Sequence, residues 1–208
     1  EAARSVLAWL GLDEPDWRVA LQSTIPIASG LGSGAAMSVA LMRALAAAAG
    51  RELPPETAST LAYEVERIHH GTPSGIDNTV IAFGQPVYFV RGQRPQPFAI
   101  NRPFLLAIGD TGIASPTKIA VGDVLACWQK EPGRYEALFN RAGEIVAEAK
   151  AAISGGTPEA LGSLMDANHA LLQEMGVSCT DLDRLVAAAR KAGAGGAKLV
   201  GGGRGGNM

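Results

Sequence analysis

The sequence predicts an α+β fold, in which helices are grouped together rather than alternating regularly with strands. Apolar residues recur at helical spacing in several segments, which tend to begin at a proline or end at a glycine. Shorter apolar stretches at 17–24 and 104–108 are typical of strands. A polar, proline-containing stretch, 92–103, indicates a connection between two lobes. We therefore expect a first lobe at residues 1–100 and a second lobe at 101–208.

The first lobe is expected to open with a helix over residues 2–10 that ends at Gly11. Residues 17–24 alternate like a half-buried strand, which Pro26 ends because proline has no N–H to donate to a ladder. A glycine turn follows. After it we expect a helix over 34–49, with one apolar stripe made of Met37, Leu41, Met42 and Leu45. A second helix is expected over 55–70, beginning at Pro55, and a strand-like segment over 79–89.

The second lobe is expected to begin with the apolar strand 104–108 and to continue mainly as helices. The spacing of apolar residues predicts helices near 117–128, 134–153, 158–174 and 181–192. Residues 197–200 are typical of a short helix end or of a strand that enters a glycine loop. The chain opens inside a helix with no capping residue and stops soon after that loop, so we expect it to be incomplete at both ends.

Composition and charge exclude several classes of protein. The net charge of −2 lacks the basic surplus of a general nucleic-acid binder. The two cysteines, Cys127 and Cys179, are too few for a disulfide framework and are typical of a reducing cytosol. The longest apolar run, Ala44–Ala49, is too short to span a bilayer, and residues 1–10 do not resemble a signal peptide. We expect a cytoplasmic protein that binds neither nucleic acid nor a membrane.

A glycine-rich turn at residues 28–36 lies between an expected strand and an expected helix. Such a turn directs several backbone N–H groups and the positive end of the helix dipole toward one point, which suits a phosphate. The alternative is a tight connection with a tolerant sequence. A P-loop is excluded because no lysine follows the last glycine. A dinucleotide fingerprint is disfavoured because no second strand precedes Glu52.

Residues 70–78, His-Gly-Thr-Pro-Ser-Gly-Ile-Asp-Asn, contain the main candidate for a catalytic carboxylate. A carboxylate that removes a proton from an alcohol needs a fixed position. A turn made by Pro73 and Gly75 can hold Asp77 in that way. The alternative is that Asp77 and Ser74 only cap the next element, and the local pattern leaves both interpretations open.

Carboxylates near histidines raise a further alternative, a metal site. Glu64 and Glu66 lie on the helix that precedes the turn. The carboxylate-x-x-His spacing of di-metal helix bundles occurs twice, in Glu66 with His69 and in Asp166 with His169. The expected strands argue against a bundle. We therefore favour a solvated acidic face for the glutamates and a packed or capping role for His169.

Three motifs stand in the order typical of the GHMP family: the glycine turn, residues 70–78 and the glycine-rich end of the chain. This family comprises small-molecule kinases of sugar and isoprenoid metabolism. Residues 25–36 resemble the ATP-phosphate motif of that family, and residues 66–78 resemble its more specific acceptor segment. Further similar stretches are 115–118, 168–172 and 192–199. The proline before Ser74 and the asparagine after Asp77 are typical of the branch whose acceptor is mevalonate. The resemblance extends through nearly all 208 residues.

The resemblance implies a two-lobed fold with an N-terminal β/α lobe and a C-terminal ferredoxin-like α+β lobe. It implies transfer of the γ-phosphoryl group of ATP to the primary hydroxyl of mevalonate, with Mg²⁺ as cofactor. The implied partners are mevalonate and ATP, and a homodimer is left open. Three alternatives remain: a related kinase with a phosphomevalonate or sugar acceptor, a non-catalytic nucleotide-binding module, and a nicotinamide-dependent oxidoreductase.

The resemblance also implies a role for each matching residue. Asp77 would orient the acceptor hydroxyl and take its proton, while Glu66 and Ser33 would hold Mg²⁺. The residues implied to bind ATP are Pro26, Ala28, Ser29, Gly30, Leu31, Gly32, Ser33, Gly34, Ala35 and Ala36. Those implied to contact the acceptor are His70, Ser74, Gly75 and Thr117, and those implied to brace the phosphate loop are Gly201, Gly202 and Gly203.

The chain departs from the family pattern at several positions. Gly34 stands where a second serine is usual. In the terminal loop, Val200, Gly202 and Arg204 stand where threonine, alanine and glycine are usual. An N-terminal motif with a lysine that contacts the acceptor oxygen and a final strand after the loop are both absent from the sequence.

Overall fold

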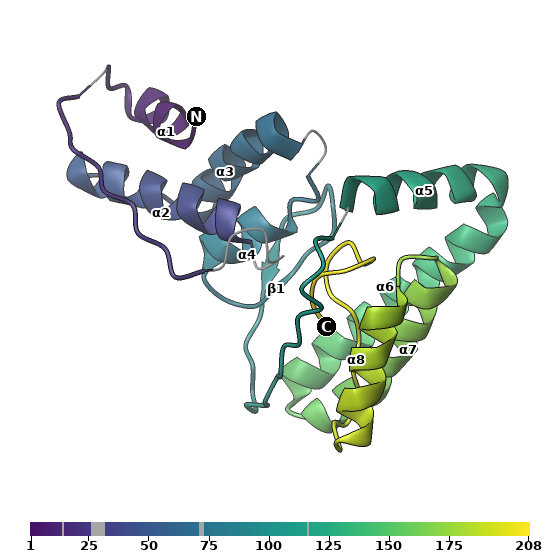
Figure 1. Cartoon of the computed structure of the whole chain (residues 1–208). Coiled ribbons are helices and arrows are strands. Elements are labelled where there is room, and N and C mark those ends of the chain that lie inside the picture. The colour runs from purple at the N-terminus through teal and green to yellow at the C-terminus, as the bar shows by residue number, and fades with distance from the viewer. Residues whose placement is uncertain (14, 26–31, 71–72, 116) are drawn as a thin grey trace. The chain divides into compact units, whose positions relative to one another are not determined.

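In the computed structural model the chain forms two compact units, unit 1 at Glu1–Ala99 and unit 2 at Ile100–Met208. The structure describes residues 1–13, 15–25, 32–70, 73–115 and 117–208, and of residues 69 and 70 only the backbone. Figure 1 traces both units with their elements labelled.

Unit 1 is built mainly from helices that pack on one another. They are α1 at Ala2–Leu10, α2 at Ser33–Ala48, α3 at Pro55–His70 and α4 at Ile76–Phe83. Helix α2 lies against α1, α3 and α4, and α3 lies against α4 (Figure 1). The buried core consists of Val6, Val39, Met42, Leu45, Ala46, Leu53, Ala58, Ala62, Val65 and Ala82. Its alanines leave room for the helix backbones to approach closely.

The local signals in the sequence fix the boundaries of these helices well. Helix α1 ends at Gly11, whose φ of 70° lies in the left-handed region that glycine adopts without strain. Helix α3 begins at Pro55, as predicted. The predicted apolar stripe of α2 is partly wrong, because Met42 is fully buried whereas Met37 is 39% exposed. The buried face of α2 consists of Ala35, Val39, Met42, Leu45 and Ala46, so Val39 lies on it where Met37 was expected.

The prediction of a strand over 79–89 is wrong for its first half, which belongs to α4. Glycines in the left-handed region flank this helix, Gly75 with φ 88° and Gly84 with φ 63°. The hydroxyl of Thr79 donates to the Gly75 carbonyl one turn earlier, at 2.6 Å. A short apolar run cannot be assigned to a helix or a strand from its periodicity alone, and the flanking glycines decide it here.

The second half of the same segment does form a strand. β1 at Val87–Tyr88 pairs antiparallel with β2 at Gln96–Pro97, with Val87 opposite Pro97. No strand is found in the described part of 17–24, although a strand was predicted there. Val19 and Leu21 are 47% and 52% exposed. Alternation supplies an apolar face, but a strand also needs a neighbouring strand to pair with.

Unit 2 is also mainly helical. Its helices are α5 at Thr117–Lys130, α6 at Pro132–Gly155, the 3₁₀ turn η1 at Pro158–Ala160, α7 at Leu161–Glu174 and α8 at Thr180–Lys191. These lie close to the predicted ranges. Helix α6 packs against both α5 and α7 (Figure 1). A buried cluster of unit 2 comprises Ala120, Tyr135, Leu138, Met175 and Val177.

The strand predicted at 104–108 is not formed, and its side chains are open to solvent, with Leu105 fully exposed. Pairing begins just after it. Gly109 exchanges two backbone hydrogen bonds with Met208, at 3.0 and 2.8 Å, and Asp110 forms an isolated antiparallel bridge with Asn207. The apolar run therefore leads into a short ladder with the end of the chain.

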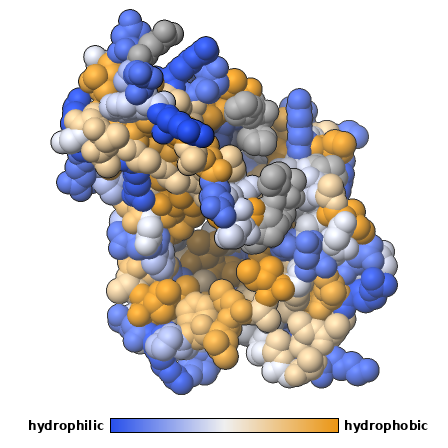
Figure 2. Space-filling view, turned by 60° about the vertical axis from the view of Figure 1, so that its left-hand side comes forward, coloured by the Kyte–Doolittle hydropathy of each residue, from blue (hydrophilic) through white to orange (hydrophobic). Residues whose placement is uncertain are grey.

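Apolar residues are also found on the surface, as the orange areas of Figure 2 show. The exposed ones of unit 2 include Leu106, Ile108, Ile119 and Val121. Within the described part of the chain, no helix combines the length and the apolar character needed to cross a bilayer.

Candidate functional site

The N-terminus of α2 presents backbone donors that have no acceptor within the helix. Gly32 is its N-cap residue, with φ 67°, and the first intrahelical bond runs from Ala36 N–H to the Gly32 carbonyl at 2.9 Å. The N–H groups of Ser33, Gly34 and Ala35 precede that bond and so have no acceptor within the helix. Together with the helix dipole they favour an anion at this end.

The carboxylate of Asp77 lies close to this helix end. A Cβ placed on Gly32 would be 3.6 Å from both Cβ and Cγ of Asp77 and 3.1 Å from Cδ1 of Ile81. Asp77 is exposed and belongs to the first turn of α4. The fold thus brings the two sequence motifs of unit 1 together, which neither motif alone predicts.

The capping alternative holds for only one of its two residues. The hydroxyl of Ser74 accepts a hydrogen bond from Ile76 N–H at 3.3 Å, which supports the start of α4. Asp77 lies inside the helix rather than at its N-cap position, which Gly75 occupies. Its carboxylate therefore stays available for another role.

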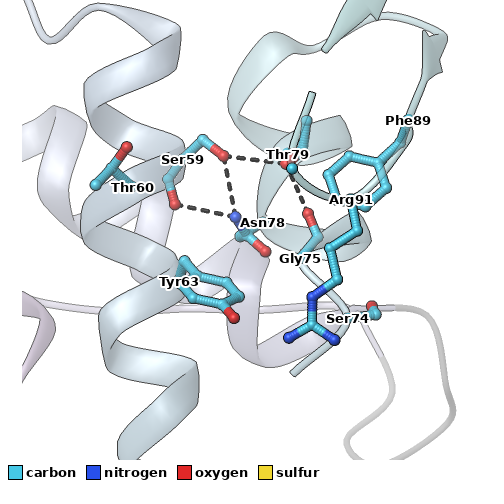
Figure 3. A pocket seen from close by; sticks show the side chains of 10 residues that line it. Ser59, Thr60, Tyr63, Ser74, Gly75, Asn78, Thr79, Phe89 and Arg91 are labelled. Carbon is cyan, nitrogen blue, oxygen red and sulfur yellow. Dashed lines mark hydrogen bonds between the residues drawn. The ribbon is translucent and has the colours of Figure 1, made fainter. Parts of the chain in front are cut away.

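A cavity of about 270 Å³ lies beside the acceptor segment (Figure 3). It is lined by Ser59, Thr60, Tyr63, Ser74, Gly75, Asn78, Thr79, Phe89, Arg91 and Gly92. The rings of Phe89 and Tyr63 lie 3.2 and 3.6 Å from the position that a Cβ on Gly75 would take. The aromatic rings thus close around Gly75, and a larger residue there would narrow the cavity.

One wall of the cavity is a buried polar network. The Asn78 amide donates to the carbonyl and to the hydroxyl oxygen of Ser59, each at 3.0 Å, and that hydroxyl lies 3.1 Å from Oγ1 of Thr79. The Oδ1 atom of Asn78 is buried and has no donor among the described residues. Figure 3 shows it pointing away from Ser59. A buried acceptor without a donor is costly, so a donor from a ligand or from water suits it.

Arg91 supplies a positive charge at this cavity, and the sequence analysis did not single it out. Its side chain extends along the cavity beside Phe89 (Figure 3). A guanidinium group recognises carboxylate and phosphate oxygens through several directed N–H groups. Arg91 belongs to none of the motifs, so only its place in the fold identifies it.

The two glutamates of α3 lie in different surroundings. The Glu64 carboxylate pairs with the Arg67 guanidinium at 2.9 Å, with both side chains about half exposed. Glu66 is half-buried. No group of three or more metal-ligating side chains is present among the described residues. A Mg²⁺ site with a single protein carboxylate is compatible with this, because Mg²⁺ usually keeps several waters and binds substrate phosphates.

The glycine loop of unit 2 packs tightly against Thr117. A Cβ on Gly202 would be 2.6 Å from Oγ1 of Thr117, and the Ser115 hydroxyl donates to the Gly203 carbonyl at 2.7 Å. Arg204 follows in the left-handed region with φ 57°. Its guanidinium bonds to the Gly176 carbonyl and to the Asp123 carboxylate. The loop and the start of α5 therefore form one packed element.

Several predicted site residues cannot be placed. Pro26, Ala28, Ser29, Gly30 and Leu31 lie outside the described residues, and His70 is described only by its backbone at the end of α3. Their roles remain predictions. Within unit 1 the structure brings together Gly32, Ser33 and Asp77, and around the cavity it brings together Ser74, Gly75 and Asn78.

The chain matches two descriptions of known protein families. Residues 1–85 match the GHMP kinases N terminal domain, and residues 145–208 match the GHMP kinases C terminal domain. The chain belongs to the GHMP kinase family. Both halves of a GHMP kinase are thus represented, which confirms the predicted fold class, although several of the predicted strands are not formed in the structure.

The GHMP kinases that resemble the chain include mevalonate kinases. It is 40% identical over 209 residues to that of Pyrococcus horikoshii and 37% identical over 195 residues to that of Thermococcus sibiricus. These alignments cover 96% and 91% of the chain and 62% and 58% of the relatives. The chain thus spans about three fifths of their length.

A solved structure shows the same similarity in three dimensions. The mevalonate kinase of L. major in complex with R-mevalonate superimposes with a TM-score of 0.81 at 33% identity. The match covers 99% of this chain and 65% of that one.

Proposed function

We propose that the protein is a kinase that transfers the γ-phosphoryl group of ATP to the primary hydroxyl of mevalonate. The observation that carries the proposal is the position of Asp77 beside the N-terminus of α2, because it places a carboxylate next to an anion-binding helix end. The mevalonate kinases among its relatives support the choice of acceptor.

The start of α2 would hold the triphosphate. The N–H groups of Ser33, Gly34 and Ala35 point out of the helix end and can donate to phosphate oxygens. Because Gly32 has no side chain, the start of α2 can approach Asp77 and Ile81 closely. The remaining residues proposed to bind ATP are Pro26, Ala28, Ser29, Gly30, Leu31 and Ala36.

Asp77 would act on the acceptor hydroxyl. Its carboxylate accepts the hydroxyl proton while the oxygen forms a bond to the γ-phosphorus, and the bond from that phosphorus to the bridging oxygen breaks to release ADP. In such loose transition states positioning and charge neutralisation contribute more than covalent chemistry. The exposed position of Asp77 gives an incoming alcohol access to it.

The cavity beside Asp77 would bind the rest of the acceptor. Mevalonate has a carboxylate and a tertiary hydroxyl besides the primary hydroxyl that reacts. Arg91 is the cation of the cavity lining and suits the carboxylate, while the buried Oδ1 of Asn78 suits a hydroxyl donor. Ser74 and Gly75 form the adjoining wall, and His70 is proposed to contact the acceptor as well.

Mg²⁺ would be held by Glu66 with Ser33. The fit is supported by the half-buried position of Glu66 and by the place of Ser33 at the phosphate-binding helix end. When bound, Mg²⁺ neutralises charge on the phosphate oxygens. In unit 2, Thr117 lies against Gly202. Thr117 is proposed to contact the phosphate or the acceptor, and Gly201, Gly202 and Gly203 are proposed to brace the phosphate loop.

Coupled measurement of ADP release tests the proposal. We expect turnover with mevalonate to exceed clearly the turnover with galactose, homoserine or phosphomevalonate. Preference for one of these other acceptors would instead favour a related kinase. ATP binding seen by calorimetry without turnover on any acceptor would favour the non-catalytic module, and binding of NAD in place of ATP would favour the oxidoreductase.

We also propose a cytoplasmic location, which is supported by the two free thiols of Cys127 and Cys179. A homodimer stays a prediction that sedimentation equilibrium tests.

A further inference from the structure

Two side chains of α7 bind the backbone of the segment that leads into the glycine loop. Oδ1 of Asp166 accepts a hydrogen bond from Ala197 N–H at 2.9 Å, and Nδ1 of His169 accepts one from Leu199 N–H at 3.3 Å. The proposed function uses neither Asp166 nor His169. Their carboxylate-x-x-His spacing was considered above as a metal-binding pattern, but here both side chains bind backbone N–H groups instead.

The geometry of helix and extended chain explains why this spacing works. Residues 166 and 169 are three apart on α7 and therefore share one face of the helix. In extended backbone, alternate N–H groups point to the same side, so those of Ala197 and Leu199 face the same neighbour. The two side chains of α7 thus take the place of carbonyl acceptors on a neighbouring strand.

The hydrogen bonds define the protonation state of His169. Because Nδ1 accepts from Leu199 N–H, the ring proton must lie on Nε2, which is 3.1 Å from Oδ1 of Asp183. The side chain is 3% exposed, so water cannot replace either partner easily. A proton added to Nδ1 would turn the acceptor into a donor that faces another donor.

Charged groups surround His169 on several elements. From α8, Asp183 faces Nε2 and also accepts from the Ser178 hydroxyl at 2.5 Å, while Arg190 pairs with Asp166 at 2.7 Å. Lys198, on the extended segment, donates to the Leu199 carbonyl. Burial lowers the pKa of His169, with Arg190 and Lys198 acting in the same direction and Asp183 opposing them. The surroundings therefore favour the neutral ring that accepts from Leu199.

The anchored segment is continuous with the glycine loop. Leu199 is fully buried, and directly after it Val200 N–H donates to the Asn207 carbonyl at 2.9 Å, which closes the base of the loop. On the far side, Arg204 N–H donates to the Val177 carbonyl at 2.8 Å. Loss of the bonds at residues 197 and 199 would release the segment that enters the loop, while the bonds at Gly203, Arg204 and Gly206 would remain.

We infer that Asp166 and His169 are positioning residues, which fix the register of residues 197–199 and thereby hold the loop Gly201–Gly206. His169 does so as a neutral acceptor. That the loop braces phosphate rests on the proposed function, whereas the anchoring itself does not. If His169 only filled space, it would be equally buried, but the position of residues 197–199 would not depend on which ring nitrogen accepts a hydrogen bond.

Two substitutions separate these roles, with amide hydrogen exchange followed by NMR. Asparagine in H169N offers an oxygen near the place of Nδ1, whereas glutamine in H169Q reaches toward Asp183 and leaves Leu199 N–H without its acceptor. We expect H169Q to speed exchange at Leu199 about tenfold, the scale of one hydrogen bond, with faster exchange at residues 201–206. H169N should retain most of the protection. Equal exchange in the two variants would overturn the inference.

The unmodified protein provides a test that does not depend on a variant folding. As the pH is lowered through the titration of His169, followed by its ring resonances, the protection factor of the Leu199 amide should fall about tenfold. The amide of Ile145, which is buried in the middle of α6, is the internal control and should not change. A Leu199 protection factor that stays constant through the titration would contradict the role of neutral His169.

Kinetics separates this inference from the proposed function. If the protein phosphorylates mevalonate, H169Q should raise the KM for ATP severalfold while kcat changes less, because the loop is proposed to brace the phosphate loop without touching the reacting atoms. A kcat loss as large as that of an Asp77 variant would contradict a positioning role. If no acceptor is phosphorylated, the proposed function fails, and the exchange measurements still decide the anchoring.

Discussion

The two glycine-rich segments of the molecule use glycine for opposite reasons. At the start of α2, a Cβ on Gly34 would meet none of the described residues within 4 Å, so this position is open toward them. In the loop of unit 2, a Cβ on Gly203 would lie 1.9 Å from the Val177 carbonyl oxygen, and one on Gly205 would lie 2.7 Å from that of Ile113. The first segment would leave room for a ligand, whereas the second packs closely against the backbone of neighbouring segments.

This difference shows that glycine content alone does not identify a phosphate site. The open segment lies beside a carboxylate and ends in N–H groups without an acceptor in their own helix. The packed one is tied to its surroundings by hydrogen bonds from Ser115 and Thr111. We expect substitutions at the first to change chemistry with little loss of stability, and substitutions at the second to do the reverse.

The largest effect is expected at the open segment, from D77N. Asparagine keeps the size of the side chain but cannot take the proton of the acceptor hydroxyl. We expect kcat to fall by about two to four orders of magnitude, the range for a positioned general base, while the melting temperature stays within a few degrees. Steady-state kinetics and thermal unfolding measure the two quantities. Turnover within a few fold of the parent would leave Asp77 as a residue of the first turn of α4 only.

The packed segment should respond mainly in stability, to G203A. The new methyl group has to displace the Val177 carbonyl, and alanine is strained at φ 73°. We expect unit 2 to lose about 2 to 5 kcal/mol, from left-handed strain and overpacking together.

Gly201 provides the matched control, because it has a similar φ of 78° but nothing within 4 Å of its Cβ position. G201A should cost only the strain, about 1 to 2 kcal/mol. Urea unfolding compares the variants. If both lose the same amount, the tight packing of the loop does not determine its stability.

Arg91 tests whether the cavity of unit 1 binds the acceptor. In R91Q the guanidinium is lost, and we expect the KM for mevalonate to rise about tenfold to one hundredfold, as for a hydrogen bond to a charged group. The KM for ATP should hardly change. R94Q is the control, since the Arg94 side chain is 85% exposed and pairs with Glu56 at 3.3 Å. A larger effect of R94Q would place the carboxylate elsewhere.

The metal ligand is tested by comparing two neighbouring glutamates. We expect E66Q to raise the Mg²⁺ concentration for half-maximal rate several times more than E64Q, because Glu66 is the proposed ligand and Glu64 is a neighbour on the same helix that is not. Mg²⁺ titration at saturating ATP measures this. A larger effect of E64Q would reverse the assignment.

The smallest effect is expected from G34S. The open space around Gly34 accepts a hydroxymethyl group without a clash, and the new hydroxyl can replace a water on Mg²⁺. The Mg²⁺ requirement should fall or stay the same, and stability should rise slightly because serine is a better helix residue than glycine. A clear rise in the Mg²⁺ requirement would show that this helix end is less open than its geometry indicates.

The sequence predicted those helix ends that a proline or a glycine marks. Pro55 marked the start of α3, and Gly11 marked the end of α1. The strands at 17–24 and 104–108 failed because a strand depends on a partner that no local pattern specifies. Helix α4 was missed because Gly75 and Gly84 were not recognised as its two ends.

The site was predicted to a similar extent. The motifs identified Asp77 and the turn before α2, but not that the two lie within a few ångströms of each other. Arg91 and Ser59 were missed because they belong to no motif and reach the cavity only through the fold. The partners of His169 could not be predicted either, since a backbone N–H carries no sequence signal.

Among the described residues Oδ1 of Asn78 is a buried acceptor without a donor, so the cavity wall would favour a guest that donates to it. A molecule that binds without a hydroxyl or amine in reach would leave that oxygen unbonded, and would forfeit about 1 to 3 kcal/mol relative to one that donates. A guest of the same shape in which that hydroxyl is replaced by hydrogen would therefore be rejected more strongly than one that is merely a methylene shorter. The cavity would thus disfavour a competitor that lacks this hydrogen-bond donor, without any additional side chain to exclude it.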